Sequence, residues 1–257
     1  MRRTTLFLVA VATTTILAGV AYAAPNAPSL ITIANDSGDS WVLSADDLGG
    51  FTDTGNGTFT IDGTGNSMWS SALDVRISDW MIEVNEDPFV NQVFGFLNTG
   101  ATSTFTITTE IMVAPVGPSS VMGGSTGGSV TDGNSDGVGG LTTVSPDPFY
   151  VGIIDGSPVA GTALHPYPFS VAPFPDPGDT VPIPTTSFGL PGPTVPGPAV
   201  TTSIGIRNKF ELAGGDSVAS TNFFVVEVPE PATISLLTLG GLALLKRRRS
   251  GTKSGRE

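Results

Sequence analysis

The chain of 257 residues contains 33 glycines, 21 prolines, no cysteine and a single histidine. Without cysteine it has no disulfide framework, no thiolate metal site and no cysteine nucleophile, and one histidine excludes a multi-histidine metal site. Charged residues make up 13% of the chain, against ~25% in a typical soluble domain.

The first 23 residues have the three parts of a secretory signal peptide. Arg2 and Arg3 form a basic start, residues 6–20 are mostly apolar, and Ala21 and Ala23 supply the small-x-small pattern that signal peptidase accepts. We therefore predict cleavage after Ala23, with signal peptidase as a partner and the mature protein outside the cytoplasm.

Residues 24–228 form a strongly acidic body. This span holds 21 acidic side chains and three basic ones, Arg76, Arg207 and Lys209, so its net charge is −18. Such a charge repels phosphate backbones, and no nucleic-acid partner is expected. The simplest interpretation is a solvated surface that keeps the protein soluble.

Alternation of apolar and polar residues predicts that the body consists of β-strands. The pattern is clearest at residues 104–113, 203–212 and 221–228. Further strands are expected at residues 30–33, 41–43, 58–61, 68–77, 80–84, 89–97, 127–131 and 149–154, separated by turn signals such as Asn56-Gly57. Many short strands predict an all-β fold, an antiparallel β-sandwich, and favour the immunoglobulin-like kind.

Aromatic residues of these strands are expected to supply the core of the sandwich, because no disulfide supports the fold. An alternative is that they line a sugar-binding face. The residues concerned are Trp41, Trp69, Trp80, Phe89, Phe94, Phe96 and Phe105.

Residues 166–198 interrupt the strand pattern, since they contain 11 of the 21 prolines. They predict a long Pro-rich loop inserted into a single domain, either extended or polyproline-like. His165 stands beside this stretch and is interpreted as an incidental loop residue.

One segment resembles half of a calcium-binding loop. Asp132, Asn134 and Asp136 occupy the first, third and fifth positions, and a glycine turn follows. The carboxylate expected at the twelfth position is missing, because Thr143 stands there, so a cation would need another ligand such as Asp147. The alternative is an ordinary surface turn. No other cofactor is expected.

The C-terminal end has the order of a membrane stop signal. Pro229, Glu230 and Pro231 predict an extended peptide just outside the membrane, since each proline restricts the residue before it. The apolar residues 232–245 are predicted to form a transmembrane helix. A basic tail, residues 246–257, follows and is predicted to stay on the cytoplasmic side; it starts with Lys246, Arg247, Arg248 and Arg249.

This combination of a Pro-Glu-Pro run, a short Leu/Gly-rich segment and an arginine cluster resembles the PEP-CTERM sorting signal of exported bacterial proteins. The resemblance implies that an exosortase, a membrane protease, recognises residues 229–231 and processes the anchor. The same tail is also named after bacterial ice-binding proteins. The resemblance further implies a place in the cell envelope or extracellular matrix, with an extracellular polysaccharide as a further partner.

Together these features favour a non-enzymatic, exported and surface-sorted structural or interaction protein, anchored in the membrane or released at the cell surface. One alternative is a surface module that binds glycan, calcium or ice. Ice would require a flat threonine face such as Thr104, Thr106 and Thr108, although these residues lack the fixed period of a solenoid.

A second alternative is a secreted hydrolase, for which the sequence offers one carboxylate cluster. Two carboxylates held at a set separation can hydrolyse a glycosidic bond. The cluster consists of Glu83, Glu86 and Asp87.

Overall fold

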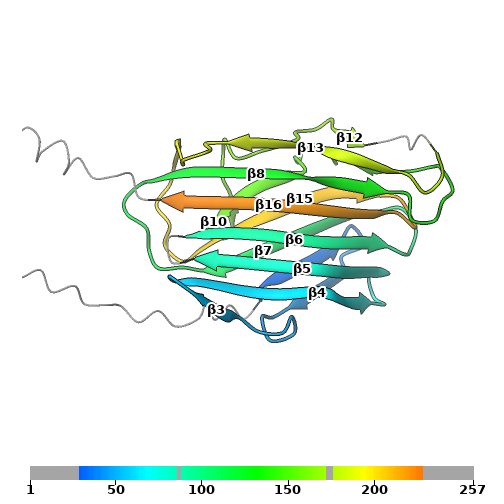
Figure 1. Ribbon diagram of the computed structural model, residues 1–257. Helices are drawn as coiled ribbons and strands as arrows, with labels where there is room; N and C mark the ends of the chain where they lie inside the picture. Colours follow the sequence, from blue (N-terminus) through cyan, green and yellow to red (C-terminus); the bar gives the residue numbers. More distant parts are fainter. Residues whose placement is uncertain (1–28, 86–87, 172–175, 228–257) are drawn as a thin grey trace, which may run out of the picture.

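The strands of this protein form two antiparallel sheets that pack face to face (Figure 1). The computed structural model describes residues 29–85, 88–171 and 176–227. Sheet A has the order β11-β10-β15-β7-β1-β2, and β9 pairs with both β15 and β12. Its strands are β1 (Ile31–Asn35), β2 (Ser40–Leu43), β7 (Ser103–Met112), β9 (Leu141–Thr142), β10 (Tyr150–Ile154), β11 (Ser157–Pro158), β12 (Ser170–Val171) and β15 (Ser203–Leu212).

Sheet B has the order β13-β8-β16-β6-β5-β4-β3, and β14 also pairs with β8. β6 in sheet B and β7 in sheet A bury every second residue, which places one face of each sheet in the core and leaves an outer face toward solvent. The strands of sheet B are β3 (Thr52–Gly55), β4 (Thr58–Ser70), β5 (Val75–Asn85), β6 (Phe89–Asn98), β8 (Ser120–Thr131), β13 (Thr180–Phe188), β14 (Val195–Gly197) and β16 (Ser217–Glu227).

The all-β, two-sheet architecture expected from the alternation is confirmed. The connectivity differs from the immunoglobulin order, because β3, β4, β5 and β6 are four consecutive strands of one sheet. Immunoglobulin sandwiches place at most three consecutive strands together before the chain crosses. The immunoglobulin-like interpretation is therefore wrong at the level of strand order.

Aromatic rings from both sheets meet in the core. Phe96 on β6 contacts Phe105 on β7 edge to face, with ring centroids 4.9 Å apart, and lies 5.8 Å from Phe210 on β15. All three rings are buried. Such edge-to-face pairs add to the stabilisation that comes from burying the rings.

Trp69 lies on the surface, contrary to the expectation that it joins the core. Its side chain is 53% exposed, whereas Trp80 is 3% exposed. The expected strand 68–77 is broken by a turn at residues 71–74, and Trp69 stands near the end of β4, directly opposite Arg76 on β5. Opposite residues of an antiparallel pair point to the same face, so both side chains lie on the outer face of sheet B.

The Pro-rich stretch is not a simple loop, because residues 166–198 contain β12, β13 and β14. β13 and β14 pair with β8 and form the edge of sheet B (Figure 1). Pro182 and Pro184 fit this place, since an edge strand needs hydrogen bonds on one side only. The loop prediction is wrong for these strands.

His165 holds the Pro-rich stretch against the body instead of standing free in a loop. It is buried, its ring stacks on Phe169 with centroids 4.2 Å apart, and its Nε2 lies 2.9 Å from the carbonyl oxygen of Pro184 on β13. Burial lowers the pKa of His165, and the contact with Pro184 opposes this shift without cancelling it. The folded state therefore favours the neutral ring.

The chain crosses from one sheet to the other between β6 and β7, and again between β15 and β16. Asn98, the last residue of β6, forms hydrogen bonds that link these two crossings. Its N–H donates to the carbonyl oxygen of Asp216 at 3.0 Å, and its own carbonyl accepts the N–H of Gly215 at 2.8 Å. Its buried side-chain Nδ2 donates to the carbonyls of Ala101 and Leu212. One residue thus donates to carbonyl groups of both crossings, of which that of Leu212 is buried.

We expect Asn98→Ala to lower the free energy of unfolding by about 3 kcal/mol, because it removes a buried amide that donates to the carbonyls of Ala101 and Leu212. Urea denaturation of the purified protein, followed by tryptophan fluorescence, measures the change. Asn91→Ala is a matched control on the same strand, since the Nδ2 of Asn91 makes one long hydrogen bond of 3.3 Å to Glu83. The control is expected to cost less than about 1 kcal/mol, and equal losses would contradict the role given to Asn98.

Candidate functional site

The predicted calcium loop directly follows β8 and is a closely hydrogen-bonded turn. Asp132 is buried, and its Oδ2 accepts the N–H groups of Gly137 and Gly178 at 2.8 and 3.0 Å. Its Oδ1 accepts the N–H of Asp136 at 3.3 Å. Burial raises the pKa of Asp132, but these backbone donors outweigh it and the pKa lies below its usual value.

Asn134 and Asp136 are held by the same turn. The Nδ2 of Asn134 donates to Asp136 and to the carbonyl of Gly214, which lies in the β15–β16 crossing. The Oδ1 of Asp136 accepts the N–H of Val138 at 2.7 Å. Each of the three predicted ligands therefore already takes part in hydrogen bonds that shape the turn.

Asp147 does not complete a cation site at this turn. Its two oxygens bind the cations of the sheet A outer face, Arg207 at 3.2 Å and Lys209 at 2.7 Å. Within the described ranges, no group of three or more His, Cys, Asp or Glu side chains is placed to hold a metal ion. Calcium binding at Asp132, Asn134 and Asp136 stays a prediction.

Asp216 lies under this turn and is the one buried acid with a strongly raised pKa in the part of the chain that the structure describes. Its Oδ2 accepts the N–H of Gly140 at 2.8 Å, and its Oδ1 has no partner among the described residues. Burial raises the pKa of Asp216 to about 6, the N–H of Gly140 opposes the shift, and the charges of Asp132 and Asp136 add to it.

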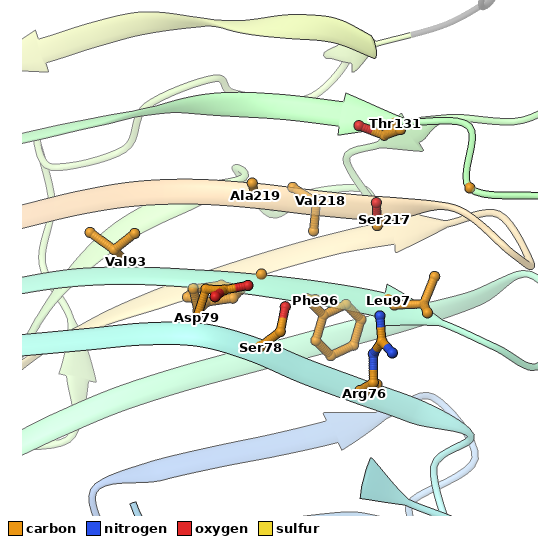
Figure 2. A pocket seen from close by; sticks show the side chains of 13 residues that line it. Arg76, Ser78, Asp79, Val93, Phe96, Leu97, Thr131, Ser217, Val218 and Ala219 are labelled. Carbon is orange, nitrogen blue, oxygen red and sulfur yellow. The ribbon is translucent and has the colours of Figure 1, made fainter. Parts of the chain in front are cut away.

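The outer face of sheet B carries a hollow with a volume of about 400 Å³, which we call the outer hollow. Figure 2 shows the side chain of Arg76 reaching from β5 toward Leu97 on β6, with Ser217 and Thr131 on the next two strands. Glycine, alanine and serine form its floor, so no large side chain fills it; the floor residues are Ser78, Gly95 and Ala219.

Arg76 differs from the other two cations of the body. Arg207 and Lys209 both pair with Asp147, whereas Arg76 is exposed and has no ion-pair partner in residues 29–85, 88–171 and 176–227. The exposed Trp69 stands beside it on β4. The sequence contained no signal for this pair, because the turn at residues 71–74 that brings them together lies inside an apparent strand.

The alternatives proposed from sequence involve other surfaces. Glu83 accepts a hydrogen bond from Asn91, and its expected partners Glu86 and Asp87 lie outside the described residues, so the hydrolase alternative stays a prediction.

The threonines suggested for ice binding share the outer face of sheet A. Thr108 lies opposite Thr32, but β15 places charged residues beside the row on its other side. The threonine array therefore stays narrow, and ice binding stays a prediction. The threonines are Thr104, Thr106 and Thr108, and their neighbours on β15 are Glu211, Lys209 and Arg207.

We expect Asp216→Asn to stabilise the protein at pH 7.5, on the order of 1 kcal/mol or ~3 °C in Tm. The folded-state pKa of about 6 exceeds the usual 3.8, so Asp216 costs stability increasingly as pH rises from about 4 to about 6. The amide removes this cost and keeps an acceptor for Gly140. Thermal unfolding at pH 4.5 and 7.5 measures the difference.

The exposed Asp39 offers a charge-matched control. Asp39→Asn also removes one negative charge, yet its effect on Tm is expected to be small at both pH values. If the two variants shift Tm equally, general charge reduction rather than the burial of Asp216 is responsible.

The residues of the predicted processing signals lie outside the described part of the chain. They are Ala21 and Ala23 at the N-terminal end, and Pro229, Glu230, Pro231, Lys246, Arg247, Arg248 and Arg249 at the C-terminal end. The expected membrane helix at residues 232–245 lies outside it too. The described residues include no helix that is long and apolar enough to span a bilayer.

Comparison with known families finds the sorting signal directly. The family model described as the PEP-CTERM protein-sorting motif matches residues 227–249, and the last strand, β16, ends at Glu227. A comparison with curated proteins gave no significant match. The resemblance that the Pro-Glu-Pro run, the apolar segment and the arginine cluster suggested is confirmed: the chain carries a PEP-CTERM sorting motif, which begins at the last residue of the final strand of a β-sandwich.

Proposed function

We propose that this protein is exported, processed by an exosortase-like membrane protease and displayed as a non-enzymatic structural or interaction module of the cell envelope or extracellular matrix. The observation that carries the proposal is the sorting motif at residues 227–249. This motif implies export and membrane-associated sorting. The signal-peptide pattern at residues 1–23 supplies the export step.

The motif begins at Glu227, the last residue of the folded body. β16 pairs along its whole length with β8, and its last residue, Glu227, lies opposite Val121. Pro229 and Pro231 follow in the sequence, and a proline disfavours the helical region for the residue before it. A protease cleft binds an extended peptide, and Glu230 is the charged group within it. Processing at this point would leave the sandwich intact.

The basic residues after the apolar segment fix its direction in this proposal. Cations beside an apolar segment are retained on the cytoplasmic side, so the body stays outside. Residues 232–245 would span roughly 21 Å as a helix, less than the ~30 Å of a hydrocarbon core. Lysine and arginine side chains that reach the interface compensate for such a deficit.

The non-enzymatic character of the body rests on its surface chemistry. The acidic side chains that the turn at residues 132–137 brings together are engaged with backbone N–H groups. The outer hollow combines one cation, Arg76, and one acid, Asp79, with hydroxyl groups and a floor of small residues. Such a set is suited to binding, and it supports an interaction role in preference to hydrolysis.

We expect Glu230→Gln, and separately deletion of residues 246–249, to block processing in a host that makes the protein naturally. The first change removes the charged group of the Pro-Glu-Pro run, and the second removes the cations that hold the segment across the membrane. Electrophoretic mobility and cell fractionation report the outcome. Glu230→Gln should keep its C-terminal end and stay with the membrane fraction, and the deletion variant should likewise remain uncleaved.

Glu257→Gln is the control, because residue 257 lies outside the matched range 227–249. It should be processed like the natural protein. Unchanged mobility and release of the Glu230→Gln and deletion variants would contradict the proposed sorting route.

A further inference from the structure

We infer that the outer face of sheet B binds an acidic polysaccharide, with Trp69 stacking on a sugar ring and Arg76 pairing with a uronate carboxylate. This inference rests on the proposed function, in which the body acts as an interaction module outside the cell, and it names the chemical class of the partner. It follows from the register of five strands, from the shape of the outer hollow and from the charge of its rim.

The strand register places the recognition groups in one straight row across sheet B. Trp69 on β4 lies opposite Arg76 on β5, which lies opposite Leu97 on β6. Leu97 pairs with Ser217 on β16, and Ser217 pairs with Thr131 on β8. With strands about 4.8 Å apart, the row spans roughly 19 Å. An extended chain can follow it perpendicular to the strands.

A neighbouring row of small residues gives the hollow its depth. Ser78, Gly95, Ala219 and Ser129 stand opposite one another on β5, β6, β16 and β8. A Cβ atom at Gly95 would approach the Oγ of Ser78 to 2.6 Å, so the floor has no room for a larger side chain there. The volume of about 400 Å³ lies within the range of known ligand sites, ~300–1,000 Å³.

Arg76 gives the row a positive charge. It is an exposed guanidinium without an acidic partner among the described residues, in a body of net charge −18. The nearby Asp79 lines the same hollow, and its Oδ1 accepts the N–H of Gly65 at 2.9 Å. A guanidinium binds a carboxylate with two parallel hydrogen bonds. Charge complementarity therefore selects a ligand that carries carboxylates.

Trp69 supplies the apolar half of the recognition. An indole ring that is 53% exposed leaves a large apolar surface in water, and aromatic rings with a polar edge are typical of binding surfaces. The C–H face of a pyranose ring covers such a surface, while its hydroxyl groups reach the Ser78, Ser217 and Thr131 hydroxyls that line the hollow. A saccharide presents both an apolar face and hydroxyl groups; an acidic peptide lacks the former.

The acidic body limits the strength of a single contact. Its charges repel an anionic polymer at long range, although physiological salt screens them beyond ~8 Å. One bidentate pair and one stacked ring therefore predict weak binding per site. Many copies displayed on one surface would bind a long polymer more tightly through multivalency.

The test uses the purified full chain in detergent and isothermal titration calorimetry with oligogalacturonides and with their methyl esters. The esters keep the sugar rings and lose the charge. We expect the natural protein to bind the acid at least ~10-fold more tightly than the ester, which corresponds to 1.4 kcal/mol. Equal affinity for the two ligands, or binding of neither, would overturn the inference.

Two variants separate the roles of the two side chains. Arg76→Gln should weaken binding of the acid ~10-fold and leave the ester unchanged, whereas Trp69→Ala should weaken both ligands ~10-fold. Arg76→Lys should recover only part of the affinity, since it keeps the charge and loses the bidentate geometry. Thermal unfolding checks that each variant is folded.

Lys209→Gln is the matched control, because it removes one positive charge from the outer face of sheet A. It should change affinity for the acid less than ~2-fold; a loss equal to that of Arg76→Gln would mean that net charge alone governs binding, and would overturn the assigned site. Sorting is measured separately in cells through Glu230→Gln. A protein that is sorted but binds no acidic sugar refutes this inference and leaves the proposed function standing.

Discussion

The side chain and backbone of Asn98 form the contact on which the arrangement of the sandwich depends. Through this residue the β6–β7 crossing is bonded to Leu212, Gly215 and Asp216 of the β15–β16 crossing. These bonds fix β16 against β6 in the register that sets Leu97 opposite Ser217. Since a slip of one residue would turn every side chain of a strand to the other face, the same bonds decide which groups line the outer hollow.

Several acidic side chains of the body accept hydrogen bonds from backbone N–H groups. Asp155 is the clearest case, because it accepts the N–H groups of Thr201, Thr202 and Ser203 and two threonine hydroxyls. Burial raises the pKa of Asp155, but these donors outweigh it and hold the pKa far below its usual value. A carboxylate in this setting stabilises the fold at neutral pH and loses that contribution only in strong acid. Asp216 behaves in the opposite way, since burial next to two other acids favours its protonated form. A negative charge in this protein therefore has either a stabilising or a destabilising effect, according to the number of N–H groups that face it.

The sequence allowed the class of fold to be predicted, but not the features that build the hollow. Period-two alternation located β15 at Ser203–Leu212 with its exact bounds, and the Asn56-Gly57 signal marked the β3–β4 turn because both patterns are local. The edge strands in residues 166–198 escaped notice, since prolines tolerated at a sheet edge conceal the alternation. The core position predicted for Trp69 is wrong because the predicted strand 68–77 spans the turn at residues 71–74, where the chain reverses. The row from Trp69 to Thr131 is set by pairing between strands far apart in sequence, which no local pattern encodes.

The outer hollow and the sorting motif lie at opposite ends of β16. Ser217, at the start of this strand, belongs to the row on the outer face, whereas Glu227, at its end, adjoins the sorting motif. The strand has 11 residues, and at ~3.3 Å per residue its ends are roughly 33 Å apart. A body attached through the end of β16 therefore holds the outer hollow away from its point of attachment, and the rigid pairing of β16 with both β6 and β8 maintains that separation. A polymer lying along the row would run across the strands rather than along them.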